Sequence, residues 1–167
     1  MTGDITLYAK WIEEEEPTEP TPPVTEPGEW ENPFADVDED DWFYGAVKYA
    51  EKNGLFSGTT ANTFAPNEAI TRGMLVTVLW RNEGEPEVTG TVTFADVSED
   101  AYYAKAIVWG QKNGIILGYS DEEFAPDDFI TREQFAAIMH RYADLKGVAA
   151  DETDDLARFT DVAEVSD

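Results

Sequence analysis

Apolar residues recur at helical spacing in the segment that follows Asp41. They lie three or four positions apart and therefore share one face of a helix: Trp42, Ala46, Tyr49 and Ala50. Asp41 is a candidate N-cap, since a short acidic side chain accepts hydrogen bonds from the free amides of a first helical turn. Gly54 suits the left-handed residue that ends a helix. The pattern predicts a helix between these two residues.

A second helical pattern begins near Thr71, after a long loop that is rich in turn-forming residues. Its apolar residues again fall at helical spacing: Met74, Leu75, Val78 and Leu79. Later in the chain, Thr131 and Gln134 fit a capping box, in which two side chains each satisfy a free amide of the other residue. The equivalent pair, Thr71 and Met74, is not expected to close one.

The chain matches itself when it is shifted by 60 residues, and no gap is needed between Phe34 and Arg81. The matching segments are 34–37 with 94–97, 52–54 with 112–114, 58 with 118, 64–66 with 124–126, 70–72 with 130–132, and 81 with 141. A third copy begins at residues 159–162 and stops at Asp167. Each complete copy predicts a helix, a long loop and a second helix, so the fold class is all-α.

Two segments of different character precede the repeats. Residues 4–11 alternate between apolar and polar side chains, which predicts a strand. This segment resembles the closing strand of the internalin-type β-grasp repeats of bacterial surface proteins. Residues 13–31 consist mainly of Glu, Pro and Thr, a composition that favours a disordered, extended and semi-rigid spacer.

Acidic residues outnumber basic residues by 36 to 11, which gives a net charge of −25. Such a chain repels a phosphate backbone and an anionic membrane, so we expect no nucleic-acid partner and no membrane insertion. The apolar runs are too short for a transmembrane helix, and residues after Met1 do not resemble a signal peptide. The acidity favours either solubility outside the cell or cation-assisted contact with an anionic wall polymer.

Catalytic and metal chemistry find little support in the sequence. The chain has no cysteine, and His140 is its one histidine. The acidic run 36–41 does not match an EF-hand loop, because Asp41 and Val47 stand where such a loop requires glycine and glutamate. We therefore expect no catalytic residue, no metal site, no cofactor and no enzymatic activity.

The repeated motifs occur in the order Phe-x-Asp-Val, an aromatic-led helix, Lys-Asn-Gly, Gly, Phe-x-Pro and Ile-Thr-Arg. This order resembles the S-layer homology family. The resemblance implies tandem helix–loop–helix repeats that pack as a pseudo-symmetric helical bundle. It divides the chain into a remnant strand of an upstream β repeat (1–12), a linker (13–31), a first repeat (32–90), a second repeat (91–150) and the start of a truncated third repeat (151–167).

The resemblance also implies a function at the surface of a Gram-positive bacterium. The family holds exported proteins on the cell non-covalently, by binding secondary cell-wall polysaccharide, often at pyruvylated sugars, in grooves between repeats. We therefore expect an extracellular location, in the cell wall or the S-layer. The alternative is a protein–protein interaction module on the surface or in a surface array. Self-association through the incomplete third repeat is a further hypothesis.

The family's Thr-Arg motif assigns polysaccharide contact to Arg72 and Arg132. A guanidinium group offers a planar fork of donors that matches the carboxylate of a pyruvate ketal; the alternative is pairing with nearby acidic residues. Further candidates are glycines for close backbone approach, aromatic residues for stacking and acids for sugar hydroxyls: Gly58, Gly118, Trp42, Tyr102, Asp36 and Asp96. The alternatives for the last four are packing for the aromatic residues and a turn or cap for the acids. The first motif departs from the family's Thr-Arg-Ala-Glu, and its Gly73 weakens a helix by about 1 kcal/mol relative to alanine.

Overall fold

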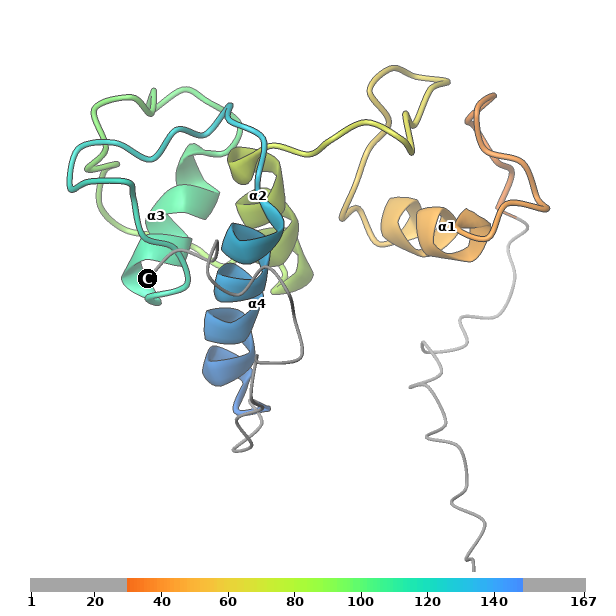
Figure 1. Ribbon diagram of the computed structural model, residues 1–167. Coiled ribbons are helices and arrows are strands. Elements are labelled where there is room, and N and C mark those ends of the chain that lie inside the picture. Colours follow the sequence, from red (N-terminus) through yellow and green to blue (C-terminus); the bar gives the residue numbers. More distant parts are fainter. Residues whose placement is uncertain (1–29, 149–167) are drawn as a thin grey trace, which may run out of the picture. The chain divides into compact units, whose positions relative to one another are not determined.

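The structure, a computed structural model, describes residues 30–148, which form four helices joined by long loops (Figure 1). The helices are α1 (Tyr44–Lys52), α2 (Arg72–Asn82), α3 (Ala104–Lys112) and α4 (Arg132–Lys146). Because residues 30–148 contain no strand, the predicted all-α fold is confirmed. The predicted N-terminal strand, nearly all of the linker and the start of the third copy lie outside the described residues.

The first helix of each repeat, α1 or α3, begins without a side-chain cap and ends before a glycine. The N-cap residue of α1 is Phe43, and the prediction that Asp41 caps this helix is wrong. The Asp41 carboxylate instead accepts a hydrogen bond from the amide of Asp38 at 2.8 Å, which holds it in the preceding turn. Gly54 follows α1 with a φ angle of 66°, so the predicted left-handed helix end is confirmed, and its repeat equivalent Gly114 follows α3 with a φ angle of 67°.

The second helix of each repeat, α2 or α4, begins at a threonine with a capping box. The predicted box of Thr131 and Gln134 is confirmed. The expectation that Thr71 and Met74 form none is wrong, because the Met74 sulfur accepts a hydrogen bond from the Thr71 amide at 3.5 Å. A thioether sulfur is only a weak acceptor, but it occupies the same place as the Gln134 amide oxygen.

The aspartate of each Phe-x-Asp-Val motif fastens the Phe-Ala-Pro segment of its own repeat. The Asp36 carboxylate accepts hydrogen bonds from the amides of Phe64 at 2.8 Å and Ala65 at 2.7 Å. The Phe64 hydrogen bond is the largest influence on the Asp36 carboxyl and holds its pKa below the usual value. In the second repeat, Asp96 binds the amide of Ala125 at 2.6 Å in the same way. Ala65 and Ala125 both have left-handed backbones, so the carboxylates support strained turns.

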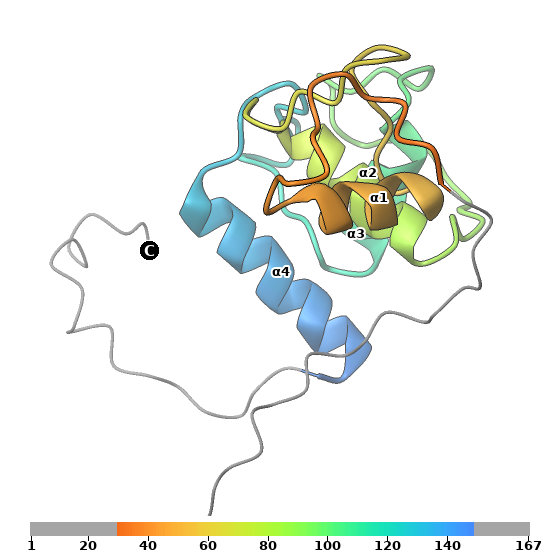
Figure 2. The ribbon, with the colours of Figure 1, turned by 90° about the vertical axis from the view of Figure 1, so that its right-hand side faces the viewer.

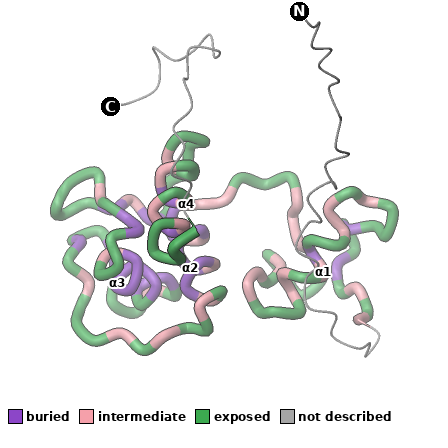
Figure 3. Tube along the Cα trace, turned by 90° about the horizontal axis from the view of Figure 1, so that it is seen from below, coloured by how far each residue is buried: buried purple, intermediate pink, exposed green. Residues whose placement is uncertain are grey.

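The main core joins the two repeats, because α2 of the first packs against α3 of the second. Buried residues accordingly gather in α2, in α3 and in the loop after α3 (Figure 3). The core consists of Leu75, Val76, Leu79, Trp80, Phe94, Val97, Tyr103, Ala106, Ile107, Trp109, Ile115, Ile116, Phe124, Ile138 and Tyr142. It includes Trp80 and Trp109, which lie at helical apolar spacing within their helices. α4 is the longest helix of the described residues, with 15 residues, and contributes the last two members (Figure 2).

The first turn of α2 lies directly on the second repeat. The amide of Arg72 donates to the carbonyl of Asp128 at 2.9 Å, and the amide of Gly73 donates to the carbonyl of Pro126 at 2.8 Å. These two donors are among the amides that a helix start leaves free, so the second repeat completes the cap of α2. The approach is close, since a Cβ at Gly73 would lie 2.9 Å from the Tyr103 ring. Glycine at this position therefore has a packing reason that the sequence did not reveal.

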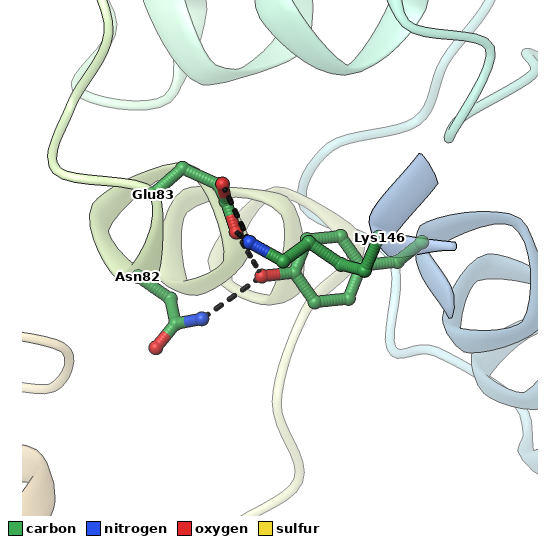
Figure 4. A network of polar contacts seen from close by, with 4 residues as sticks. Asn82, Glu83 and Lys146 are labelled. Atoms are coloured by element: carbon green, nitrogen blue, oxygen red, sulfur yellow. Dashed lines mark hydrogen bonds and ion pairs between the residues drawn. The ribbon is translucent and has the colours of Figure 1, made fainter. Parts of the chain in front are cut away.

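The C-terminal ends of α2 and α4 are joined by a polar network (Figure 4). Glu83, just after α2, accepts hydrogen bonds from the Tyr142 hydroxyl and from Lys146, whose Nζ lies 3.0 Å away. Asn82 donates to the same hydroxyl at 2.9 Å. The Tyr142 hydrogen bond, and then that of Lys146, lowers the pKa of the Glu83 carboxyl. The network ties the two repeats together at the end opposite to the caps.

Candidate functional site

The second repeat contains a pocket of about 230 Å³ into which the first repeat contributes one arginine. We call it the second-repeat groove; its lining residues are Arg72, Leu117, Gly118, Tyr119, Gln134, Ala137, Ile138 and Arg141. Pockets that bury drug-sized ligands measure roughly 300–1,000 Å³. The second-repeat groove is smaller and suits a single small group.

Arg72 reaches the groove from the first turn of α2 and is only 4% exposed. Its Nε donates to the carbonyl of Phe124 at 2.9 Å, and its Nη2 donates to the carbonyl of Leu117 at 3.3 Å. Its Nη1 donates to the side-chain oxygen of Gln134 at 3.3 Å. The guanidinium carbon also lies 4.5 Å from the centroid of the Tyr119 ring and 4.7 Å from that of Phe124. The second repeat thus fixes this side chain in one orientation.

The positive charge of Arg72 has no carboxylate partner among the described residues. All three of its hydrogen-bond acceptors are neutral oxygens, although the chain carries 36 acidic side chains. The alternative that Arg72 pairs with a nearby acid is therefore not what the structure shows. A guanidinium group has five N–H donors, and these three bonds leave one N–H on each terminal nitrogen. A buried cation of this kind favours an anionic ligand.

Gln134 connects the arginine to the rest of the groove. Its side-chain oxygen accepts from Arg72 and from the Thr131 amide, while its side-chain nitrogen donates to the Tyr119 hydroxyl at 3.0 Å. The Tyr119 ring is half exposed at 52% and forms an aromatic wall of the groove. The same side chain therefore caps α4 and orients two lining residues.

Arg141 is a second arginine of this groove, and the sequence motifs did not indicate it as a binding residue. It lies on α4 and is partly exposed, and its side chain makes no hydrogen bond or ion pair with any described residue. A signal was present in the sequence, because Arg141 matches Arg81 at the repeat distance. Only the fold places it in the same pocket as Arg72.

The first repeat has a pocket in the equivalent position, of about 180 Å³, which we call the first-repeat groove. Its lining residues are Leu55, Phe56, Ser57, Met74, Thr77, Val78, Arg81 and Tyr102. Tyr102 comes from the second repeat and is 61% exposed, so this predicted stacking residue does border a groove. The lining is otherwise mostly apolar.

The other predicted binding residues lie in different surroundings. Arg132 is exposed and lines neither groove, and its side chain has no hydrogen bond or ion pair within residues 30–148. Trp42 is 93% exposed and also lies outside both grooves, with its ring against Phe43. The carboxylates of Asp36 and Asp96 hold the loop turns described above. Sugar contact by these four side chains stays a prediction.

The two predicted glycines are explained first by loop packing. A Cβ at Gly58 would lie 2.5 Å from the carbonyl oxygen of Thr63. A Cβ at Gly118 would lie 2.2 Å from that of Ser120. Gly118 nevertheless lines the second-repeat groove, so its backbone is also placed for a ligand.

No group of three or more His, Asp or Glu side chains in residues 30–148 is arranged to hold a metal ion. His140 is exposed and lies 3.5 Å from the Asp144 carboxylate. No helix within residues 30–148 has the length and hydropathy needed to cross a membrane.

Comparison with known proteins adds a family match. Residues 33–73 and 93–136, together half of the chain, match the model of the S-layer homology domain. The chain is 35% identical over 120 residues to the surface-layer 125 kDa protein of Lysinibacillus sphaericus. These 120 residues cover 72% of this chain and 10% of that protein. It is 32% identical over 112 residues to a cellulosome-anchoring protein of Acetivibrio thermocellus, with coverages of 65% and 25%.

An enzyme is similar to the chain as well, but over a small part of its length. An endoglucanase of Bacillus sp. (strain KSM-635) is 35% identical over 109 residues, which cover 65% of this chain and 11% of the enzyme. The chain therefore spans a quarter or less of each of these three relatives. The similarity to the endoglucanase concerns a segment that it shares with surface-layer proteins.

Proposed function

Because this chain belongs to the S-layer homology domain family, we propose that it anchors an exported protein to the cell wall by binding an acidic cell-wall polysaccharide. A location at the cell surface follows from the family, whose matched members include surface-layer and anchoring proteins. The chain supplies a binding module rather than a catalytic one. The polysaccharide, with a pyruvylated sugar as the favoured ligand, occupies the second-repeat groove.

The observation that supports this proposal is the buried Arg72 guanidinium without a carboxylate partner among the described residues. A carboxylate of the sugar supplies the missing negative charge and accepts the remaining N–H groups. The aromatic ring of Tyr119 and the backbone at Gly118 contact the sugar beside it. Because the chain as a whole is strongly negative, attraction to an acidic polymer depends on this local positive charge.

Binding to purified cell walls tests the proposal. We expect native walls to retain the chain, and walls stripped of their secondary polysaccharide to release it. Equal retention on stripped walls contradicts the proposal and favours a protein partner or peptidoglycan itself. A surface-protein extract that captures the chain without polysaccharide supports the alternative of a protein–protein interaction module.

A substitution at Arg72 sharpens the same experiment. Arg72→Lys keeps the charge but loses the planar fork, so we expect wall retention to fall by roughly tenfold, equivalent to about 1.4 kcal/mol. Arg132→Lys is the matched change at the equivalent, exposed position, and we expect an effect below about twofold there. Circular dichroism of both variants checks that the helices remain. A loss at Arg132 as large as that at Arg72 contradicts the assignment to this groove.

Self-association through the third copy stays a prediction, because residues 151–167 lie outside the described residues. Sedimentation of the chain over a range of concentrations measures it directly. A mass that rises with concentration supports self-association, and a constant monomer mass counts against it.

A further inference from the structure

We infer that the two grooves are not equivalent: Arg72 and Arg141 together bind the acidic group of a sugar in the second-repeat groove, and the first-repeat groove does not take an acidic group. This inference rests on the proposed function and specifies its site. It makes Arg141 a specificity-determining residue. It also predicts one acidic sugar per chain.

The grooves occupy the same place in the two repeats, so they can be compared residue by residue. Five lining residues of the first-repeat groove have counterparts 60 residues later in the second-repeat groove: Ser57 and Leu117, Met74 and Gln134, Thr77 and Ala137, Val78 and Ile138, and Arg81 and Arg141. The backbone elements are thus shared, and the difference lies in side-chain chemistry.

The equivalent arginines differ in their partners. Arg81 donates from Nη1 to the carbonyl of Leu55 at 3.2 Å, and its Nε lies 3.8 Å from the Glu85 carboxylate. Arg141 has neither kind of contact with any described residue. Part of the Arg81 charge is therefore compensated within the protein, whereas that of Arg141 remains available to a ligand.

The second-repeat groove also receives an arginine from the neighbouring repeat. Arg72 enters it from α2, while the residue that the second repeat contributes to the first-repeat groove is Tyr102. Among the described residues, the second-repeat groove therefore has two guanidinium groups without a carboxylate, and the first has one that is paired with an acid. The Coulomb attraction for an anion is correspondingly larger in the second-repeat groove.

The polar lining also favours an anion in the second-repeat groove over the first. Gln134 offers an amide that already bridges Arg72 and Tyr119. Met74, at the equivalent place, offers a thioether, and Phe56 lies in the same groove. A carboxylate that entered the first-repeat groove would lose its hydrating water. The charged donor it would meet there is Arg81, which is already paired, so the transfer is unfavourable.

Isothermal titration of the 167-residue chain with an acidic monosaccharide tests the inference. The probe is the methyl glycoside of a hexosamine that carries a pyruvate ketal, and its methyl ester is the uncharged control. We expect one site per chain, and we expect esterification to weaken binding by at least about tenfold because the ester cannot form charge-assisted bonds. Two sites of similar affinity, or equal binding of the ester, overturn the inference.

Matched substitutions assign the site to one groove. Arg141→Gln is expected to weaken binding of the acidic probe by about tenfold, and Arg81→Gln by less than about twofold. Arg141→Lys, which restores the charge, is expected to recover part of the affinity. The thermal unfolding midpoint of each variant verifies that it is folded. A loss with Arg81→Gln that equals or exceeds the loss with Arg141→Gln overturns the inference.

Wall binding separates a failure of this inference from a failure of the proposed function. If walls retain the chain but the acidic probe does not bind, or Arg141→Gln has no effect on probe binding, only the inference is wrong. If neither the probe nor native walls bind the chain, the proposed function is wrong as well.

Discussion

The first helices of the two repeats occupy the same place in the repeat but differ in burial. In α3, Ala106 and Ile107 are fully buried. At the equivalent places in α1, Ala46 is exposed and Val47 is 4% exposed. The residues that predicted the apolar face of α1 are mostly uncovered, and Val47 is the one buried residue of this helix. The difference arises because α2 packs on α3, while within residues 30–148 no helix is packed against α1 to the same extent.

The second helices show the opposite arrangement. Val76 of α2 is fully buried, whereas the equivalent Ala136 of α4 is exposed. Arg72 is buried by the second repeat, and the equivalent Arg132 is exposed. A repeat of this kind therefore has two faces, one on each helix, and each face is buried only when a neighbouring repeat covers it.

Substitution of a central α3 residue should have the largest effect. Ile107→Ala removes a fully buried side chain, so we expect the free energy of unfolding to fall by about 2–5 kcal/mol. The matched change Val47→Ala affects a cluster of three buried residues, and we expect a loss of about 1–2 kcal/mol. Urea unfolding followed by circular dichroism measures both. A loss at Val47 as large as that at Ile107 would show that α1 is packed as tightly as α3.

Gly73→Ala tests whether packing or helix propensity dominates at the first turn of α2. Alanine favours the helix by about 1 kcal/mol, but its Cβ would lie 2.9 Å from the Tyr103 ring and 3.0 Å from the Pro126 carbonyl oxygen. Overpacking costs about 1–3 kcal/mol, so we expect a net loss of about 1 kcal/mol. The matched change Gly45→Ala, in α1 where a Cβ would meet nothing within 4 Å, should instead raise the free energy of unfolding by up to about 1 kcal/mol. A Gly73→Ala variant with a raised thermal midpoint would disprove the close contact.

The polar network between α2 and α4 should give the smallest effect, and one that depends on pH. The pKa of Glu83 is lowered in the folded chain, chiefly by the Tyr142 hydroxyl. The contribution of Glu83 to the free energy of unfolding is therefore present at a pH above 4.5, the pKa of this carboxyl in the unfolded chain. That contribution is lost as the pH falls from 4.5 through the lowered folded value. We expect Glu83→Gln and Tyr142→Phe each to cost about 1 kcal/mol or less at pH 7 and to reduce the loss of stability below pH 4.5.

Thermal unfolding at pH 7 and pH 3 measures this difference. Glu85→Gln serves as the control, because Glu85 is 56% exposed and takes no part in the network. An unchanged pH dependence in Glu83→Gln would mean that other carboxylates determine the acid sensitivity of this chain.

Several local features could be predicted from neighbouring residues alone. The glycine after α1, the capping box of Thr131 and Gln134, and the burial of Trp80 and Trp109 follow from patterns within a few turns of chain. The N-cap of α1 could not be predicted in this way, because the Asp41 carboxylate had an equally local alternative partner, the amide of Asp38. The capping box of Met74 was missed because sulfur is a weak acceptor that is seldom considered.

The amino-acid sequence by itself determined the repeat, its helix–loop–helix units and the family to which the chain belongs. These depend on periodicity and on short motifs, which are local properties of a chain. The tertiary structure alone decided that Arg72 is buried and unpaired with any described acid, that Arg141 lines the same groove and that the two grooves differ. Such properties depend on which repeat covers which face, and side chains 60 or more residues apart become neighbours only after the chain has folded.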